Sequence, residues 1–133
     1  MLKDIHIPNV YIYGTLDNPV HAGNLKDTLD CISKKHEDTF VIAIDACLGA
    51  SEHIGYLCIK DGPLVPGAAM KKNLPPVGDV NITGIVNMCG FLDNLILQST
   101  RLSVVMAMSN LISGGLKYVL CQKQKTLNLQ KAF

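Results

Sequence analysis

An aspartate at the end of an apolar run is the residue best suited to chemistry. Asp45 follows the five apolar residues 40–44 (FVIAI) and precedes Ala46 and Cys47. A carboxylate is costly to remove from water unless it is paired or hydrogen-bonded, so this position needs an explanation. Asp45 either activates water or binds a cation, or it caps a turn at a strand end by accepting backbone N–H groups. Residue type and position favour the two interpretations equally.

Two further side chains carry reactive atoms. His21 could be a base or a metal ligand, but a surface histidine is the interpretation that we favour. Cys47 would be a nucleophile if a nearby base or a helix N-terminus lowered its pKa. The sequence shows neither feature, so a small buried apolar role is favoured for Cys47.

Three loops would gather the candidate residues. Ligands of open α/β sheets bind at the carboxyl ends of the parallel strands. The loops that follow expected strands are 14–21 (GTLDNPVH), 45–49 (DACLG) and 87–90 (NMCG). If the strands are parallel, these loops open at one edge of the sheet. The candidate pocket around Asp45 then comprises His21, Cys47, Gly49, Asn87 and Arg101.

Arg101 stands in a largely apolar segment. Its guanidinium could hold a carboxylate through two hydrogen bonds, or its stem could pack while its head reaches solvent. The glycines from Gly49 to Gly55 form neither a phosphate-binding loop nor a dinucleotide-binding loop, because the required lysine and glycine spacings are absent. We therefore expect no cofactor.

Strands alternating with helices must position these residues. Strand-like runs lie at 9–13, 40–45, 54–59 and 80–86. A first helix should begin at Asn18-Pro19, with one apolar face formed by Ala22, Leu25, Leu29 and Ile32. Strand, helix and strand in this order predict a βαβ unit in a parallel sheet.

A second helix is expected over 91–116. It should stop at Gly114-Gly115 and lie deep against the sheet, because its apolar residues cover most of its circumference. Its apolar stretch, Leu102–Ile112, is too short to cross a bilayer and is typical of a buried helix. The segment 61–78 is dense in glycine and proline, so we expect a loop there.

The composition predicts one soluble domain. The 133 residues are 48% hydrophobic and 17% charged, with a net charge of +1, which favours neither nucleic acid nor an acidic membrane as a partner. Five cysteines without a C-x-x-C pair predict reduced thiols, and Pro8 and an early acid interrupt any signal peptide. We expect a single domain over 1–133 with a tail at 113–133, in the cytoplasm and without a membrane partner.

Four segments together resemble the YyaC sporulation family, a relative of the spore germination protease. They are GTLDNPVHAGNL (14–25), IAIDACLG (42–49), GPLVPGAAMKKNLPPVGDVNITGIVN (62–87) and LQSTRL (97–102). The segments keep the family's order and similar spacing over roughly four-fifths of the chain. Several unusual blocks in series are a far more specific signal than any single motif.

The resemblance implies a three-layer αβα fold of the phosphorylase and hydrolase type, with a mostly parallel sheet. The germination protease and, more distantly, the endopeptidases that mature nickel hydrogenases share this fold. By position, Asp45 is similar to one of two acids thought to act together in the germination protease. The endopeptidases bind metal with a like-placed acid and a later histidine; Asn87 stands near that histidine's position, so the resemblance implies no metal here.

The sequence departs from the family at its front. The family's domain opens with a strand and a glycine-rich block, of the form GTDRSTGDSLGP, which supplies the second acid; this sequence has no such block. We expect an N-terminally shortened chain whose exposed strand edges favour homo-oligomers.

Three functions are consistent with these features. The first is a sporulation-associated peptidase that uses Asp45 on a peptide or protein substrate in the spore or mother cell. The second is a non-catalytic or vestigial relative that binds a partner. The third is a small-ligand-binding α/β domain, which only an analogy of fold supports.

Overall fold

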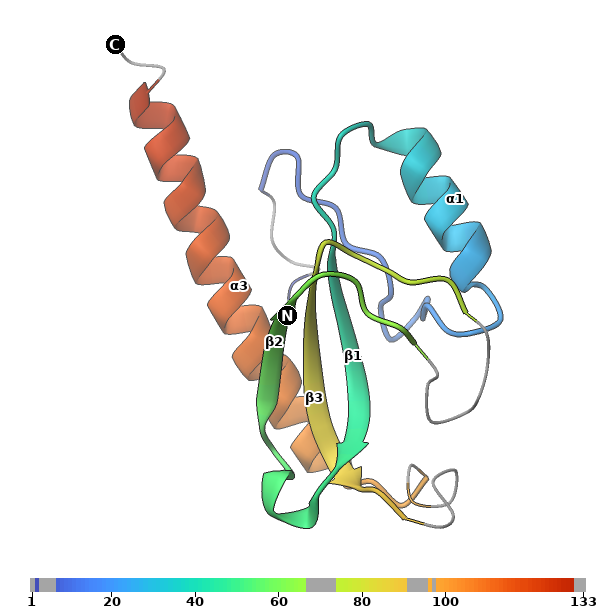
Figure 1. Ribbon diagram of the computed structural model, residues 1–133. Coiled ribbons are helices and arrows are strands. Elements are labelled where there is room, and N and C mark those ends of the chain that lie inside the picture. Colours follow the sequence, from blue (N-terminus) through green and yellow to red (C-terminus); the bar gives the residue numbers. More distant parts are fainter. Residues whose placement is uncertain (1, 3–6, 67–73, 91–95, 97, 131–133) are drawn as a thin grey trace.

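The computed structural model describes residues 2, 7–66, 74–90, 96 and 98–130. The helices and strands follow the order α1 (Leu25–Lys35), β1 (Ile42–Gly49), η2 (Ser51–His53), β2 (Leu57–Asp61), β3 (Val80–Met88) and α3 (Leu102–Gln130). Figure 1 shows a narrow sheet between a short helix, α1, and a long one, α3, which extends well past the sheet. The described residues thus form a small mixed α/β arrangement.

The sheet is mixed rather than mostly parallel. Its order is β1-β3-β2, with β1 parallel to β3 and β2 antiparallel to β3. The predicted parallel pairing is confirmed for β1 with β3 and is wrong for β2. A short connection explains the difference: β2 follows β1 after one 3₁₀ turn, which leaves too few residues for the crossover that a parallel neighbour needs.

The core lies on the central strand. Ile44, Ile82 and Ile59 stand side by side across the three strands, and α3 packs behind this row through β3. Ile82 is 6% exposed, whereas Ile44 and Ile59 on the outer strands are 46% and 72% exposed. Helix α3 therefore covers the middle of this face and leaves its margins open. Among the described residues, α3 and the 3₁₀ turn η2 contact β3, whereas α1 makes little contact with any strand, so the three-layer arrangement stays a prediction.

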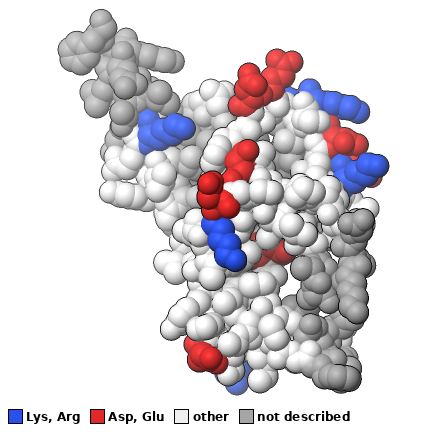
Figure 2. All heavy atoms as spheres, in the orientation of Figure 1, with Lys and Arg blue, Asp and Glu red and all other residues white. Residues whose placement is uncertain are grey.

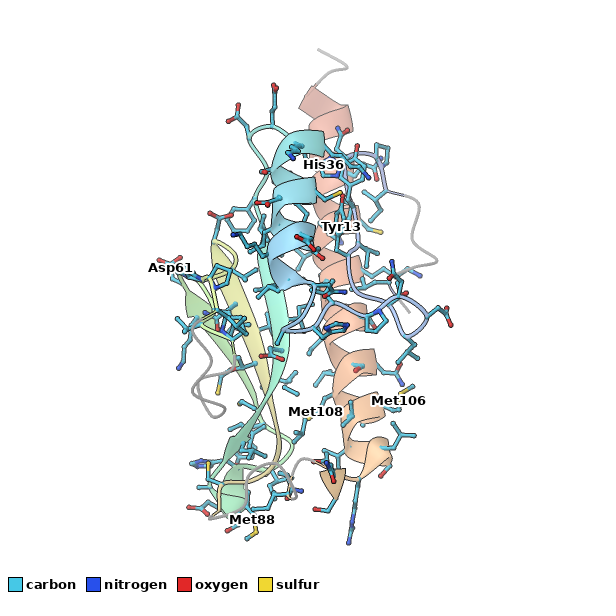
Figure 3. The ribbon with its side chains drawn as sticks, turned by 90° about the vertical axis from the view of Figure 1, so that its right-hand side faces the viewer. Tyr13, His36, Asp61, Met88, Met106 and Met108 are labelled. Carbon is cyan, nitrogen blue, oxygen red and sulfur yellow. The ribbon has the colours of Figure 1, made fainter. Side chains whose placement is uncertain are left out.

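A close contact joins α3 to the sheet. Met108 is 6% exposed, and Figure 3 shows it on the side of α3 nearer the sheet, with Met106 on the other side. A Cβ atom added at Gly84 would lie 2.8 Å from Cε of Met108. A glycine at this point of β3 therefore lets the methionine reach the sheet.

The predicted strand at 9–13 is wrong. Residues with left-handed backbone, Asn9 (φ 63°) and Gly14 (φ 83°), bound this segment, and it joins no ladder. Its aromatic side chains instead contact His36 at the end of α1. Tyr11 stacks on the imidazole with ring centroids 3.8 Å apart, and the Tyr13 hydroxyl lies 2.9 Å from Nε2 in a hydrogen bond (Figure 3).

Helix α1 is confirmed, but it begins later than predicted. The N-cap residue of α1 is Asn24. Its side-chain amide donates to the carbonyl of Pro19, and its Oδ1 accepts from the N–H of His21. These bonds hold 19–24 in turns, so the proline does not open the helix. Asp27 in the first turn and Lys34 in the last complement the helix dipole.

Helix α3 differs most from the prediction. It runs 29 residues, through Gly114 and Gly115, so 113–130 is helical rather than an irregular tail. It does not lie deep against the sheet, because three strands cover only a part of it and Leu102 is 71% exposed.

Helix α3 also meets a simple membrane criterion. By length and composition, Leu102–Gln124 could cross a membrane, with a mean hydropathy of 1.4 over 18 residues. The prediction of a stretch too short to span a bilayer rested on 102–112 alone. One such helix is weak evidence, because core helices of soluble proteins pass the same test. The cytoplasmic location stays a prediction.

Candidate functional site: the Asp45 face of the sheet

Asp45 lies in the middle of a strand. Strand β1 continues through Gly49, so the acid does not cap a strand end, as one interpretation required. Side chains alternate along a strand, and Asp45 and Cys47 therefore project from the face opposite Ile44. Asp45 and Cys47 therefore lie on a face of the sheet, and not at its edge, where the sequence predicted the candidate pocket.

The strand register shows what surrounds the acid. Thr83 of β3 pairs with Asp45 on one side and with Cys58 of β2 on the other. Cys47 is the next residue of β1 on the same face, and the Thr83 side chain hydrogen-bonds it. We call Asp45, Cys47, Cys58 and Thr83 the Asp45 face. It combines one carboxyl, one hydroxyl and two thiols.

The Asp45 carboxyl is partly desolvated. Burial raises its pKa above the ordinary value of 3.8, and a hydrogen bond from the Ala46 N–H to Oδ1, at 2.8 Å, opposes the rise. Solvent still reaches Asp45, so its surroundings raise the pKa of the carboxyl without excluding water from it. A carboxyl with a raised pKa holds a proton at a higher pH than a free aspartate, which suits it to proton transfer.

The Cys47 thiol is poorly suited to nucleophilic attack. Burial raises its pKa above 9.0; the hydrogen bond with Thr83 lowers it, and the neighbouring Cys58, Asp45 and Cys89 raise it further. The attacking species in thiol chemistry is the thiolate, which these surroundings disfavour. The favoured interpretation of Cys47, a small and largely apolar residue, agrees with this environment.

His21 and Arg101 lie outside the strands, whereas Asp45 lies within β1. His21 precedes α1 instead of standing in its first turn, and its Nδ1 accepts a hydrogen bond from the Gly23 N–H at 3.1 Å. Arg101 is exposed at the start of α3, where its carbonyl accepts from Val104. Neither side chain hydrogen-bonds Asp45 in the described part of the chain.

Gly49 and Asn87 hold the ends of β1 and β3 in place. A Cβ at Gly49 would lie 2.9 Å from Cγ2 of Ile85, and the Gly49 carbonyl accepts from the Cys89 N–H. The Asn87 amide donates to the Ile96 carbonyl at 2.9 Å and to Oγ1 of Thr100 at 3.3 Å. Both residues thus have a structural explanation that does not require a ligand.

The residues described offer little to a metal ion. Within them, no group of three histidine, cysteine or acidic side chains is placed to hold one. A surface hollow beside α1 is lined by Asp27, Asp30, Cys31, Lys34 and Lys35, none of which was a predicted site residue.

Sequence reasoning missed Thr83 and Cys58. Alternation from Asp45 predicts which residues of β1 share its face, but the cross-strand partners depend on register and on the direction of β2. Neither can be read from a single strand. The Val80–Met88 run did carry a signal for Thr83. Asn81, Thr83 and Ile85 alternate with Ile82 and Gly84, which places Thr83 on the face opposite Ile82.

The sheet and its polar face define the class of protein: a mixed α/β domain that presents a solvent-accessible carboxyl on a sheet face. Within this class, the chain belongs to the family described as "Protein of unknown function (DUF1256)", whose model matches residues 1–115. The predicted resemblance is thereby confirmed.

A curated relative shows the same membership. The chain is 50% identical over 115 residues to the "Uncharacterized protein YyaC" of Bacillus subtilis (strain 168). The match covers 86% of this chain and 56% of the relative, so the chain spans little more than half of that protein's length. No solved structure matches the chain.

Proposed function

We propose that this chain carries one acid, Asp45, of a peptide-hydrolysing site in a sporulation-associated, cytoplasmic protein. The observation that supports the proposal is the position of a solvent-accessible carboxyl in the middle of a strand, paired with Thr83 of the neighbouring strand. Desolvation raises the pKa of this carboxyl, which agrees with a role in proton transfer. The resemblance of the 42–49 block to the germination protease supplies the substrate class, a peptide or protein. Because the chain covers 56% of its relative, the activity of the whole protein is part of this proposal.

The proposed role of Asp45 is that of the protonated partner in an acid pair. Two neighbouring carboxyls divide the work when their surroundings push their pKa values apart. Desolvation raises the pKa of Asp45, so this carboxyl would keep its proton and donate it to the leaving amine. The ionised partner would activate water. The residues described here place no second carboxylate in hydrogen-bonding contact with Asp45.

The experiment compares Asp45→Asn with the parent on a mixed peptide library, with products identified by mass spectrometry. Loss of general acid catalysis should lower the cleavage rate about 10²- to 10⁴-fold. The matched control is Asp61→Asn, an exposed acid on β2 whose side chain projects from the opposite face. If Asp45→Asn cleaves as fast as the parent, Asp45 has no part in the chemistry.

A second candidate function is binding without catalysis. The exposed Ile44 and Ile59, together with a largely uncovered α3, favour it, because contiguous apolar surface is typical of interaction sites. Retention of library peptides by the parent and by Asp45→Asn alike, with no products, would support this function. Cleavage by the parent alone would rule it out.

A further inference from the structure

Helix α3 carries an exposed apolar stripe. Ala107, Leu111, Gly114 and Tyr118 follow each other at intervals of four, three and four residues, and all four are exposed. Leu111 is 66% and Tyr118 68% exposed, and Val119 beside them is 60% exposed. Spacings of three and four place residues on one side of a helix, as in the seam of a paired helix. In Figure 2, the visible part of α3 at the left is white apart from a basic side chain near its upper end.

One glycine of this stripe, Gly114, is followed directly by a second, Gly115, which lies about 100° further around the helix. Glycine in a helix interior destabilises the helix relative to alanine, and here two are adjacent. A Cβ at Gly114 or at Gly115 would meet nothing within 4 Å among the residues that the structure describes, so no contact with those residues explains the two glycines. Small residues in a helix face do permit the close approach of a second helix.

The stripe has a two-fold pattern about these glycines. A two-fold axis between Gly114 and Gly115 relates Leu111 to Tyr118, which are both large and apolar. A symmetric dimer needs a surface that is complementary to itself in this manner. In an antiparallel pair of helices crossing there, Leu111 would face the partner's Tyr118, and the glycines would meet at the closest point.

The charges of α3 favour the antiparallel direction. The helix contains Lys117, Lys123 and Lys125, and the sequence of Leu102–Gln130 has no acid. Parallel helices would bring each lysine beside its own copy, whereas antiparallel helices set Lys117 beside the partner's Ile112 and separate the basic ends. Met108 stays on the sheet side, so the first turns of α3 keep their contact with β3.

We propose that the stripe Ala107–Leu111–Gly114–Tyr118 of α3 binds the same stripe of a second copy of this chain, as an antiparallel helix pair. The proposal is independent of the peptidase function. It concerns this chain rather than its family, because Tyr118 and Val119 lie beyond the residues that the family model matches. It also places self-association on a helix, not on the strand edges that the sequence suggested.

The first measurement is the molar mass in solution by sedimentation over a wide concentration range. The expected mass is twice the 14.4 kDa of one chain. Leu111→Glu and Tyr118→Lys should each raise the dissociation constant about tenfold or more. Leu102→Glu is the matched control, because Leu102 is equally exposed but lies on the opposite side of α3. It should leave the dimer intact.

A charge exchange tests the direction of the pair. In the antiparallel dimer, Glu introduced at Leu111 faces Lys introduced at Tyr118 of the other copy, so the double variant L111E/Y118K should recover the dimer. An equimolar mixture of the two single variants should form a mixed dimer. In a parallel pair the double variant would place Glu against Glu and Lys against Lys, so it would not recover the dimer. A double variant that remains monomeric therefore overturns the antiparallel assignment.

A lipid surface is the rival occupant, and it is tested directly. The parent chain is floated with vesicles of phosphatidylcholine and phosphatidylglycerol. A monomeric parent that floats with the vesicles, and a Leu111→Glu variant that does not, would assign the stripe to lipid and overturn the proposal. A monomeric parent that fails to float overturns it as well, and a dimer that is insensitive to Leu111→Glu excludes the stripe as its interface.

Discussion

Gly78 lies against Ala43 at the start of the strand that carries Asp45. A Cβ at Gly78 would be 3.0 Å from Cβ of Ala43, 3.1 Å from its nitrogen and 3.1 Å from the carbonyl oxygen of Val41. Next to this contact, the Asp79 carboxylate accepts from the Val41 N–H at 2.7 Å, and the Asp79 N–H donates to the Val41 carbonyl. This junction fixes the point at which β1 begins beside β3.

Gly78→Ala should therefore be strongly destabilising. Its φ of +89° disfavours any side chain, and the contacts are with backbone that cannot give way. We expect a loss of about 2–4 kcal/mol in the free energy of unfolding, from strain and overpacking together. Gly62→Ala separates the two causes, since Gly62 has φ +92° and open space around it. Denaturant titrations showing equal losses for the two variants would refute the packing role of Gly78.

Met108→Ala should loosen α3 from the sheet. The side chain is buried against Gly84, and its truncation leaves a void in a small core. We expect a destabilisation of about 2 kcal/mol, at the low end for buried methionine because the sheet is narrow. Leu102→Ala, at an exposed position of the same helix, should change the unfolding midpoint little. Equal effects of the two would mean that Met108 does not anchor the helix.

Asp45→Asn should raise stability at neutral pH. Desolvation raises the pKa of Asp45 in the folded chain above 3.8, so the folded state binds the proton more tightly than the unfolded state. The resulting stability is complete below pH 3.8 and is lost as the pH rises through the folded-state pKa. Asparagine avoids that loss and can still accept from the Ala46 N–H. Solvent access keeps the effect small.

Thermal unfolding as a function of pH measures this difference. The curves of parent and Asp45→Asn should diverge as the pH rises above 3.8, with the variant the more stable at pH 7. Asp61→Asn, whose carboxyl is exposed on β2, should follow the parent. Parallel curves for Asp45→Asn would show that the pKa of Asp45 is not raised in the folded protein.

Cys47 should be slow to react with alkylating agents. Burial, the largest cause, raises its pKa, and the hydrogen bond with Thr83 partly offsets this. Iodoacetamide at pH 7.5 should therefore modify the exposed Cys89 well before Cys47, as read by peptide mass spectrometry. Thr83→Val removes the hydrogen bond that lowers the pKa of Cys47, so it should slow the reaction of this thiol further. A Cys47 that reacts first would restore it as a candidate nucleophile.

Much of the local structure could be predicted from hydrophobic pattern. The runs at 40–45, 54–59 and 80–86 each contain the start of a strand, because apolar periodicity reflects burial, although β1 begins at Ile42 and β2 only at Leu57. The helix predicted from Asn18-Pro19 forms over Leu25–Lys35. The run at 9–13 shows the limit: its β-branched and aromatic residues fit a strand, yet Tyr11 and Tyr13 contact His36 instead. Propensity is overridden when a side chain finds a better partner elsewhere.

The candidate site was predicted in part. Asp45 and Cys47 do share a face, but the acid lies inside β1, because Ala46 to Gly49 pair with β3 and extend the strand beyond it. The direction of β2, which brings Cys58 to this face, depends on tertiary pairing. Likewise, Gly114 and Gly115 resemble a helix stop, yet α3 continues through them. Substrate, partners and location stay predictions.

The irregularity between Cys47 and Leu48, where β1 shifts its register on β3, divides the strand into two parts with different tolerance of length changes. Inserting one residue between Ile42 and Asp45 would turn apolar side chains of β1 toward solvent or carry Asp45 to the side covered by α3. Beyond the shift, an inserted residue could be absorbed by a second bulge. Insertions and deletions should thus be excluded from 42–47 and accepted at 48–50, a pattern that a scan of single-residue indels would reveal.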